Sequence, residues 1–316
     1  MSGEATMRIS ATIEQVDMSH MAMIEHAEIA AKAGVDGLWV SQLPNQRDSA
    51  MLLAGLAARV SDVAIGTAVF PIYLSPPAVM AQTALTLDEI SGNRLVLGLG
   101  RGHRFFAEWM LGGRYPASVA PVREYLTIVT SLIRQGEVNA AGSWFSARAM
   151  YGAPRRAELP VYLGSFGPRM LELAGELADG VILWLCTPSY VRDVVMPSLR
   201  AGWARRPGGH DGFGVVVILP ALVSPQPEQG RDCGRNMLNG YLRIENYQKL
   251  LTASGFGDDV RSLRVSEAMI DDLCAIGSAQ TVRERIAAYR AAGVTEIALN
   301  SLEEKDFVAT VEAGLA

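Results

Sequence analysis

The sequence contains few of the side chains that build disulfide frameworks or metal centres. Only three of its 316 residues are cysteines, Cys186, Cys233 and Cys274, and no two of them have a CxxC spacing. Its four histidines form neither an HExxH motif nor a cluster along the chain. A disulfide scaffold, a zinc site and a catalytic metal are therefore disfavoured, and reduced thiols indicate a cytoplasmic protein.

Long apolar runs and clustered positive charge are also missing. No uninterrupted apolar stretch approaches the roughly 20 residues that a membrane helix needs, and the first ten residues, MSGEATMRIS, lack an apolar signal core. The formal net charge is −5. Because neutralising phosphates requires clustered Lys and Arg, a general nucleic-acid binder is disfavoured. We expect a protein that binds neither membranes nor nucleic acid.

Eight short β-rich runs alternate with longer segments of helical spacing. Most of the runs are nearly continuous in Val, Ile, Leu and Trp, which is typical of parallel strands that helices cover on both faces. The even alternation without a dividing linker predicts an α/β fold of the (β/α)8 barrel type rather than a doubly wound sheet. The runs span residues 8–14, 37–42, 63–70, 94–100, 160–164, 180–186, 213–223 and 295–301.

We expect residues 1–316 to form one barrel domain, with residues 1–6 disordered. Two segments, 103–159 and 224–280, are longer than ordinary barrel connections. We expect both to carry extra helices near the barrel mouth, and a loop at 225–232 to open the second.

The predicted ends of the strands lack several catalytic motifs. There is no GxSxG turn of a serine hydrolase and no GxxxxGKS/T phosphate loop. No pair of carboxylates of the kind that hydrolyses glycosides is visible there. The strand ends carry glycine, hydroxyl and amide groups instead, which suits a large, flat organic ligand.

The stretch LVLGLGRGH, residues 95–103, begins as a buried strand and ends in alternating glycines. Gly98, Gly100 and Gly102 remove three side chains at the strand end, so another group comes close to the backbone there. The spacing differs from the dinucleotide-binding GxGxxG. The residues alone leave two interpretations open, a tight turn or a loop against a ligand.

The stretch GSFGPRMLELAGE, residues 164–176, predicts a helix that begins at Pro168, because proline presets the first helical turn. The N–H groups of Arg169 and Met170, the helix dipole and a guanidinium would together form an anion site. An ordinary helix start is the alternative. An anion site beside a flat cavity points to a phosphate-bearing cofactor.

Two long blocks resemble the luciferase-like (β/α)8 flavin and deazaflavin oxidoreductases. GTAVFPIYLSPPAVMAQTALTLDEISGNRLVLGLGRG, residues 66–102, is similar to the family's strand, proline-rich turn, long helix and glycine-rich strand end. PVYLGSFGPRMLELAGELADGVIL, residues 160–183, and IGSAQTVRERIAAYRAAGVTEIALN, residues 276–300, continue the similarity. The GPRML turn and the compact chain resemble the coenzyme F420-dependent branch more than the FMN branch.

The resemblance implies an oxidoreductase that holds coenzyme F420 in the barrel mouth and transfers a hydride at C5 of the deazaflavin. Because that ring reacts poorly with oxygen, a reductase or dehydrogenase is expected. The resemblance also implies a non-prolyl cis peptide at Ala68–Val69, against the ring. By position, the cofactor-binding residues are Ser41, Ala68, Val69, Phe70, Arg101, Gly102, Ser165, Phe166, Gly167, Pro168, Arg169 and Met170.

The chain departs from the sugar-phosphate dehydrogenases of this branch. They carry Asp-His at the end of the second strand and Glu after the fourth, where this chain has Ser41, Gln42 and His103. Phe106 takes the position of a family asparagine. Their substrate is therefore not expected, and a small, fairly apolar organic substrate is.

Two side chains are the candidates for catalysis. His103 has an unperturbed pKa near neutrality and is expected to donate or accept a proton, with a surface or phosphate-side histidine as the alternative. Gln42 is expected to orient the substrate by hydrogen bonding. Trp39, Trp109 and Trp184 are expected to pack rather than to bind substrate.

Alternatives to this reading stay open. The alternative enzyme is an FMN-dependent luciferase-like monooxygenase. The non-enzymatic alternative is a barrel that binds cofactor without turnover. The expected partner is a small-molecule substrate, and no metal is expected. The resemblance allows a homodimer, since dimers are common in the family.

Overall fold

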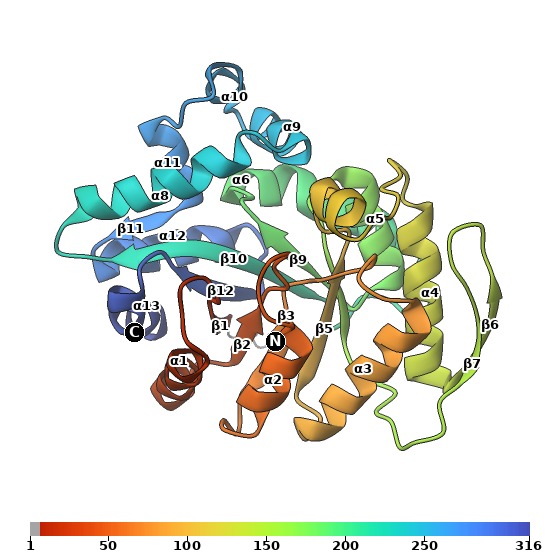
Figure 1. Ribbon diagram of the computed structural model, residues 1–316. Coiled ribbons are helices and arrows are strands. Elements are labelled where there is room, and N and C mark those ends of the chain that lie inside the picture. Colours follow the sequence, from red (N-terminus) through yellow and green to blue (C-terminus); the bar gives the residue numbers. More distant parts are fainter. Residues whose placement is uncertain (1–6) are drawn as a thin grey trace, which may run out of the picture.

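The structure, a computed structural model that describes residues 7–316, is a closed barrel of eight parallel strands surrounded by helices (Figure 1). β12 pairs with β1 to close the ring, with Glu296 opposite Arg8. The predicted (β/α)8 fold is confirmed, and the expectation for residues 1–6 lies outside the described residues. The barrel strands are β1 (Arg8–Thr12), β2 (Gly37–Val40), β3 (Ala64–Thr67), β5 (Leu95–Gly100), β8 (Val161–Gly164), β9 (Gly180–Trp184), β10 (Gly214–Val223) and β12 (Glu296–Ser301).

The helices that cover the barrel begin and end at residues suited to helix termini. The Ser19 hydroxyl caps α1 by accepting from the Ala22 N–H at 3.1 Å, and Gly34 ends α1 in the left-handed conformation. None of the helices within residues 7–316 is long and apolar enough to cross a bilayer. The covering helices are α1 (His20–Ala33), α2 (Ser49–Ala57), α3 (Pro77–Ile90), α4 (Ala120–Gln135), α5 (Pro168–Leu177), α6 (Pro188–Tyr190), η2 (Val191–Val195), α7 (Met196–Trp203), α12 (Ala279–Ala291) and α13 (Phe307–Leu315).

Side chains along the strands alternate between two apolar layers. In β2, Leu38 and Val40 pack in the helix-side layer, while Trp39 packs inside the barrel. Nε1 of Trp39 donates to the buried Glu296 carboxylate at 2.7 Å, and Arg8 pairs with the same carboxylate at 3.2 Å. The barrel interior is therefore filled by packed side chains, and we call this layer the floor. Its buried side chains are Trp39, Val96, Tyr162, Ile182, Val216, Ile218 and Ala298.

The glycines of β5 make room for the neighbouring strand. Gly98 and Gly100 alternate with Leu99, which packs in the helix-side layer, so both glycines face the barrel interior. A Cβ atom on Gly98 would overlap the carbonyl oxygen of Thr67, and one on Gly100 would lie 2.5 Å from Cγ2 of Val69. The groups that come close to this strand end are thus the Thr67 backbone in β3 and the Val69 side chain just after it.

The first long segment, residues 103–159, contains more than helices. It holds the π-helix η1 (Phe106–Met110), α4 and an antiparallel hairpin of β6 (Glu137–Ala141) and β7 (Ser146–Met150). The hairpin departs from the expectation because its side chains alternate between exposed and half-buried positions and form no apolar run.

The second long segment places four helices over the mouth side of the barrel (Figure 1). The expected loop at 225–232 is wrong from Pro227 onward, because proline in the first turn begins α8 there. We call residues 224–274 the insertion. Its helices are α8 (Pro227–Tyr241), α9 (Glu245–Ala253), α10 (Gly257–Ser262) and α11 (Glu267–Leu273), and β11 (Ala275–Gly277) follows.

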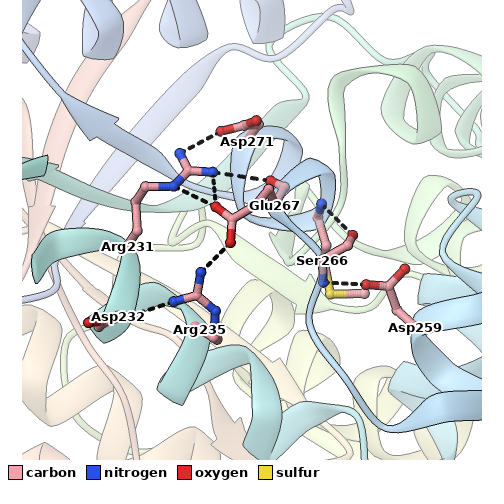
Figure 2. A network of polar contacts seen from close by, with 8 residues as sticks. Arg231, Asp232, Arg235, Asp259, Ser266, Glu267 and Asp271 are labelled. Atoms are coloured by element: carbon pink, nitrogen blue, oxygen red, sulfur yellow. Dashed lines mark hydrogen bonds and ion pairs between the residues drawn. The ribbon is translucent and has the colours of Figure 1, made fainter. Parts of the chain in front are cut away.

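Ion pairs fasten the first and last helices of the insertion to each other (Figure 2). Arg231 of α8 donates from Nε to Oε2 of Glu267 and from Nη1 to Oδ1 of Asp271, each at 2.7 Å. Arg235, one turn later, pairs with Glu267 and with Asp232. The Asp271 and Glu267 carboxylates hold the pKa of Arg231 above its ordinary value. α8 and α11 are therefore tied together at the edge of the insertion.

Candidate active site

The carboxyl ends of the eight strands meet at one end of the barrel, which we call the mouth. In (β/α)8 barrels the loops at this end carry the reacting groups. The insertion lies over the mouth beside β9 and β10 (Figure 1). In the part of the chain that the structure describes, no group of three or more His, Cys, Asp or Glu side chains could hold a metal ion.

The backbone after β3 turns inward through a cis peptide bond between Ala68 and Val69, at the position that the family resemblance implied. The Ser41 hydroxyl donates to the Ala68 carbonyl oxygen at 2.9 Å, and the Ala68 N–H donates to the Val40 carbonyl at 2.9 Å. Val69 packs on the interior floor from the mouth side. Phe70 is only 1% exposed and packs in the helix-side layer, so its side chain lies away from the mouth.

The loop after β5 holds three candidate residues, Arg101, Gly102 and His103. Arg101 is engaged by the loop that precedes α4: its guanidinium donates to the Pro116 carbonyl and lies 4.0 Å from the centre of the Tyr115 ring. Gly102 has a φ of +63°, which favours glycine. His103 is partly buried, and burial lowers its pKa. Its imidazole is therefore neutral at pH 7 and able to accept a proton.

Gln42 is held by its own loop. Its amide oxygen accepts from the Ser49 N–H at 2.9 Å, and its amide nitrogen donates to the carbonyl oxygens of Leu43 and Arg47 at 3.3 and 3.5 Å. Both ends of the amide are thus engaged between β2 and α2. This geometry favours a role in shaping the loop over the expected role in orienting a substrate, because reaching the substrate would break these bonds.

The loop after β8 leads into α5 as the sequence predicts. Gly167 caps α5 without a side-chain hydrogen bond, and a Cβ atom there would meet no atom within 4 Å. The Met170 N–H is used inside the turn, where it donates to the Gly167 carbonyl at 3.0 Å. Helix geometry directs the Arg169 N–H out of the helix end, beside the exposed Arg169 side chain. One of the two expected backbone donors is therefore available to an anion.

Hydrogen bonds fix the two residues that come before this helix start. The Ser165 N–H donates to the Ile182 carbonyl at 3.2 Å, and the Phe166 carbonyl accepts from the Tyr190 hydroxyl at 3.0 Å. Strand β9 and helix α6 thus hold the loop in place from two sides.

Aromatic rings from one strand, two helices and two loops form a continuous row at the mouth, which we call the aromatic row. Trp184, at the end of β9, lies 5.8 Å from Tyr241 of α8, and Tyr241 lies 4.7 Å from Tyr247 of α9, measured between ring centres. Tyr247 also lies 5.0 Å from Phe166 and 5.9 Å from His103. The insertion therefore supplies the apolar wall of the mouth, which the local sequence pattern did not reveal.

The three tryptophans singled out in the sequence have different environments. Trp39 packs in the barrel floor as expected, and Trp184 joins the aromatic row. Trp109 is 82% exposed on η1, with its ring centre 5.2 Å from that of Phe105. The expectation that Trp109 packs is wrong, because η1 directs it toward solvent at the rim of the mouth.

Glu14 is a candidate that the sequence reasoning missed. It follows β1 and accepts from Asn300 Nδ2 at 2.5 Å and from the Thr12 hydroxyl at 3.3 Å. Burial raises its pKa, and those two hydrogen bonds oppose the shift. Burial also raises the pKa of Tyr241, and the nearby Glu14 charge adds to that shift. The signal was available, because Glu14 ends the first predicted strand run.

The residues around the mouth are of the kinds that a flat ring with an anionic tail requires. The packed floor stops a ring from entering the barrel, and Val69 offers it an apolar surface. The aromatic row provides a wall, and the α5 start at Gly167 offers open space at the positive end of a helix. His103 and Glu14 are the protonatable groups beside these surfaces. The residues suit a redox cofactor of this shape.

Comparison with known proteins agrees with this geometry. A family model described as luciferase-like monooxygenase matches residues 5–296. A 5,10-methylenetetrahydromethanopterin reductase of Archaeoglobus fulgidus is 27% identical over 304 residues, covering 90% of this chain and 91% of the relative. An F420-dependent glucose-6-phosphate dehydrogenase of Amycolatopsis mediterranei is 29% identical over 198 residues, covering 57% and 58%. The solved structure of an F420-dependent secondary alcohol dehydrogenase with an F420-acetone adduct shares the fold, with a TM-score of 0.82, 18% identity and coverage of 98% and 99%.

Proposed function

This chain belongs to the luciferase-like monooxygenase family, and from that premise we propose that it is a coenzyme F420-dependent oxidoreductase. Its reaction is hydride transfer between C5 of the deazaflavin and a small, fairly apolar organic substrate. The observation that carries the proposal is that relatives aligned with this chain are F420-dependent enzymes, among them the glucose-6-phosphate dehydrogenase and the secondary alcohol dehydrogenase described above.

The geometry of the mouth supports the choice of cofactor. The start of α5 suits an anionic tail, and Val69 with the aromatic row suits a flat ring. Phe70 is left out of the contact set because its side chain is 1% exposed and packs in the helix-side layer. The residues proposed to hold the cofactor are Ser41, Ala68, Val69, Arg101, Gly102, Ser165, Phe166, Gly167, Pro168, Arg169 and Met170.

Coenzyme F420, when bound in its reduced form, supplies a hydride at C5 of the deazaflavin. The chain's own task is then to place the substrate and to move a proton. His103, neutral at pH 7 because burial lowers its pKa, accepts a proton or passes it on. Glu14 keeps its proton to a higher pH than an exposed glutamate does, because burial raises its pKa, and it is the second candidate group for proton transfer.

An apolar substrate is favoured by the side chains around these two groups. The aromatic row lines one side of the mouth, and Phe106, buried to 4% exposure, stands where the family resemblance places an asparagine. At the rim, Phe105 and Trp109 present 55% and 82% exposed aromatic side chains. An apolar substrate lowers its free energy by burying its surface against these side chains. The same side chains provide few hydrogen-bonding groups for a sugar phosphate.

Titration of the purified chain with F420 and, separately, with FMN tests the proposal. We expect saturable quenching of F420 fluorescence, weakened by Arg169→Ala at the α5 start. The matched control is Arg200→Ala, which removes an exposed arginine from α7, a covering helix outside the mouth. Tight FMN binding without F420 quenching would instead indicate the FMN monooxygenase. F420 binding without hydride exchange on any member of a ketone, aldehyde and alkene panel would indicate a barrel that binds cofactor without turnover.

A further inference from the structure

We propose that Tyr115 is a positioning residue that fixes the His103 loop and links it to helix α9 of the insertion. The inference rests on the role of His103 given above and extends it to a side chain that the sequence pattern did not single out. Tyr115 acts through its neighbours and is assigned no contact with substrate or cofactor.

The contacts of Tyr115 reach the residues that lead into His103. Tyr115 is 7% exposed and lies between η1 and α4. Its hydroxyl donates to the carbonyl oxygen of Gly102 at 2.9 Å. The Arg101 guanidinium lies 4.0 Å from the centre of its ring and donates to the carbonyl of the next residue, Pro116. One side chain thus holds both residues that come before His103.

The peptide between Gly102 and His103 is where this loop is free to turn. Gly102 has a φ of +63°, in a region that glycine enters at little cost. On the far side, the His103 carbonyl accepts from the Ala107 N–H at 3.1 Å, which anchors the loop to η1. The Tyr115 hydroxyl restrains the Gly102 carbonyl, and a change in the backbone angles at this point would move the imidazole relative to the Tyr247 ring that it faces.

Tyr115 also connects this loop to the insertion. Nδ2 of Asn246, in α9, donates to the Tyr115 hydroxyl at 3.5 Å. The next residue, Tyr247, faces His103 with ring centres 5.9 Å apart. Helix α9 therefore meets the loop from two directions. A shift of α9 that admits a substrate to the mouth changes both contacts together, so the position of His103 follows that of the insertion.

Two variants that lose the same atom separate positioning from stability. Tyr115→Phe removes the bond to Gly102. Tyr125→Phe removes an equivalent bond in α4, from a fully buried hydroxyl-bearing side chain to the Ser75 carbonyl at 3.0 Å. A purely structural role predicts similar effects of the two changes on every readout.

The first readout needs no cofactor and follows the pH titration of the His103 ring by NMR, assigned with His103→Asn. The ring that faces His103 is Tyr247, and burial lowers the His103 pKa. We expect Tyr115→Phe to raise the titration midpoint, because a loosened loop admits water to the imidazole. Tyr125→Phe should leave the midpoint unchanged. In the enzyme with F420, Tyr115→Phe should lower kcat on the order of 10- to 100-fold, the scale of a misplaced catalytic group.

The outcomes distinguish the two proposals. A His103 midpoint in Tyr115→Phe equal to that of the unaltered chain overturns the positioning role. Equal shifts in Tyr115→Phe and Tyr125→Phe overturn it too, because they indicate general loosening. Full activity of His103→Asn, with the Tyr115→Phe shift still present, refutes the proton-transfer role of His103 and leaves the positioning by Tyr115 intact.

Discussion

Gly100→Ala tests how β5 fits the chain that follows β3. The added Cβ atom would lie 2.5 Å from Cγ2 of Val69, whereas ordinary van der Waals contacts begin at 3.4 Å. Val69 is branched at Cβ and packs on the barrel floor, so it has little freedom to rotate away. Overpacking of this kind should lower the free energy of unfolding by about 1–3 kcal/mol.

Urea denaturation of a double-mutant cycle checks the reasoning. Val69→Ala removes both γ carbons, so Gly100→Ala should cost less in that background, with a coupling energy of roughly 0.5–3 kcal/mol. The control is Gly240→Ala in α8, where a Cβ atom meets nothing within 4 Å. It should stabilise by about 0.5–1 kcal/mol, because alanine favours helix more than glycine does. An equal cost of Gly100→Ala in both backgrounds would refute the assigned contact.

Further predictions concern the mouth and the insertion. His103→Asn should lower kcat by about 10²- to 10⁴-fold with F420 affinity retained, as measured by steady-state kinetics and cofactor titration; an unchanged kcat moves proton transfer to another group. Because burial raises the folded-state pKa of Glu14 above its ordinary 4.5, the folded state holds that proton more tightly, and the associated stability is lost as pH rises through the folded pKa. Glu14→Gln should therefore gain stability relative to the unaltered chain between mildly acidic and neutral pH in urea unfolding, and a difference independent of pH contradicts the shift. Trp109→Ala should raise KM more for large apolar substrates than for small ones, whereas Trp144→Ala, in the turn of the β6–β7 hairpin, should not; equal effects would remove η1 from substrate binding. Glu267→Gln should lower the free energy of unfolding only slightly and lose its effect at high salt, because the Glu267 side chain is 58% exposed; a large, salt-independent loss of stability in denaturation would contradict this.

The barrel could be predicted because its strands carry the same signal eight times. A parallel strand covered on both faces must be apolar throughout, and each predicted run contains one barrel strand. The β6–β7 hairpin gave no such signal, because its side chains stay exposed or half-buried. The start of α8, residues 227–232, has the polar, glycine-containing composition of a loop, so the sequence predicts a loop where the helix begins.

The site was predictable in place but not in side-chain direction. A position after a strand follows from the strand pattern, so His103 and the start of α5 could be located. The direction of Arg101 depends on Tyr115 and Pro116, which a separate loop supplies. Glu14 is buried beside Asn300, 286 residues further along the chain. The position of Glu14 at a strand end is visible in the sequence, whereas its contact with Asn300 is not.

Strand β10 extends past the barrel rim to pair with β11, so that Val223 lies opposite Gly277. The chain thus leaves the wall and rejoins it on adjacent strands, with the insertion closed off between them. All eight barrel strands lie outside this span. Its replacement by a segment of different length therefore leaves the pairing between the barrel strands unchanged. Such a replacement alters the wall of the mouth directly, and it alters stability through side chains such as Leu238 and Leu273, which pack in the same core cluster as the barrel.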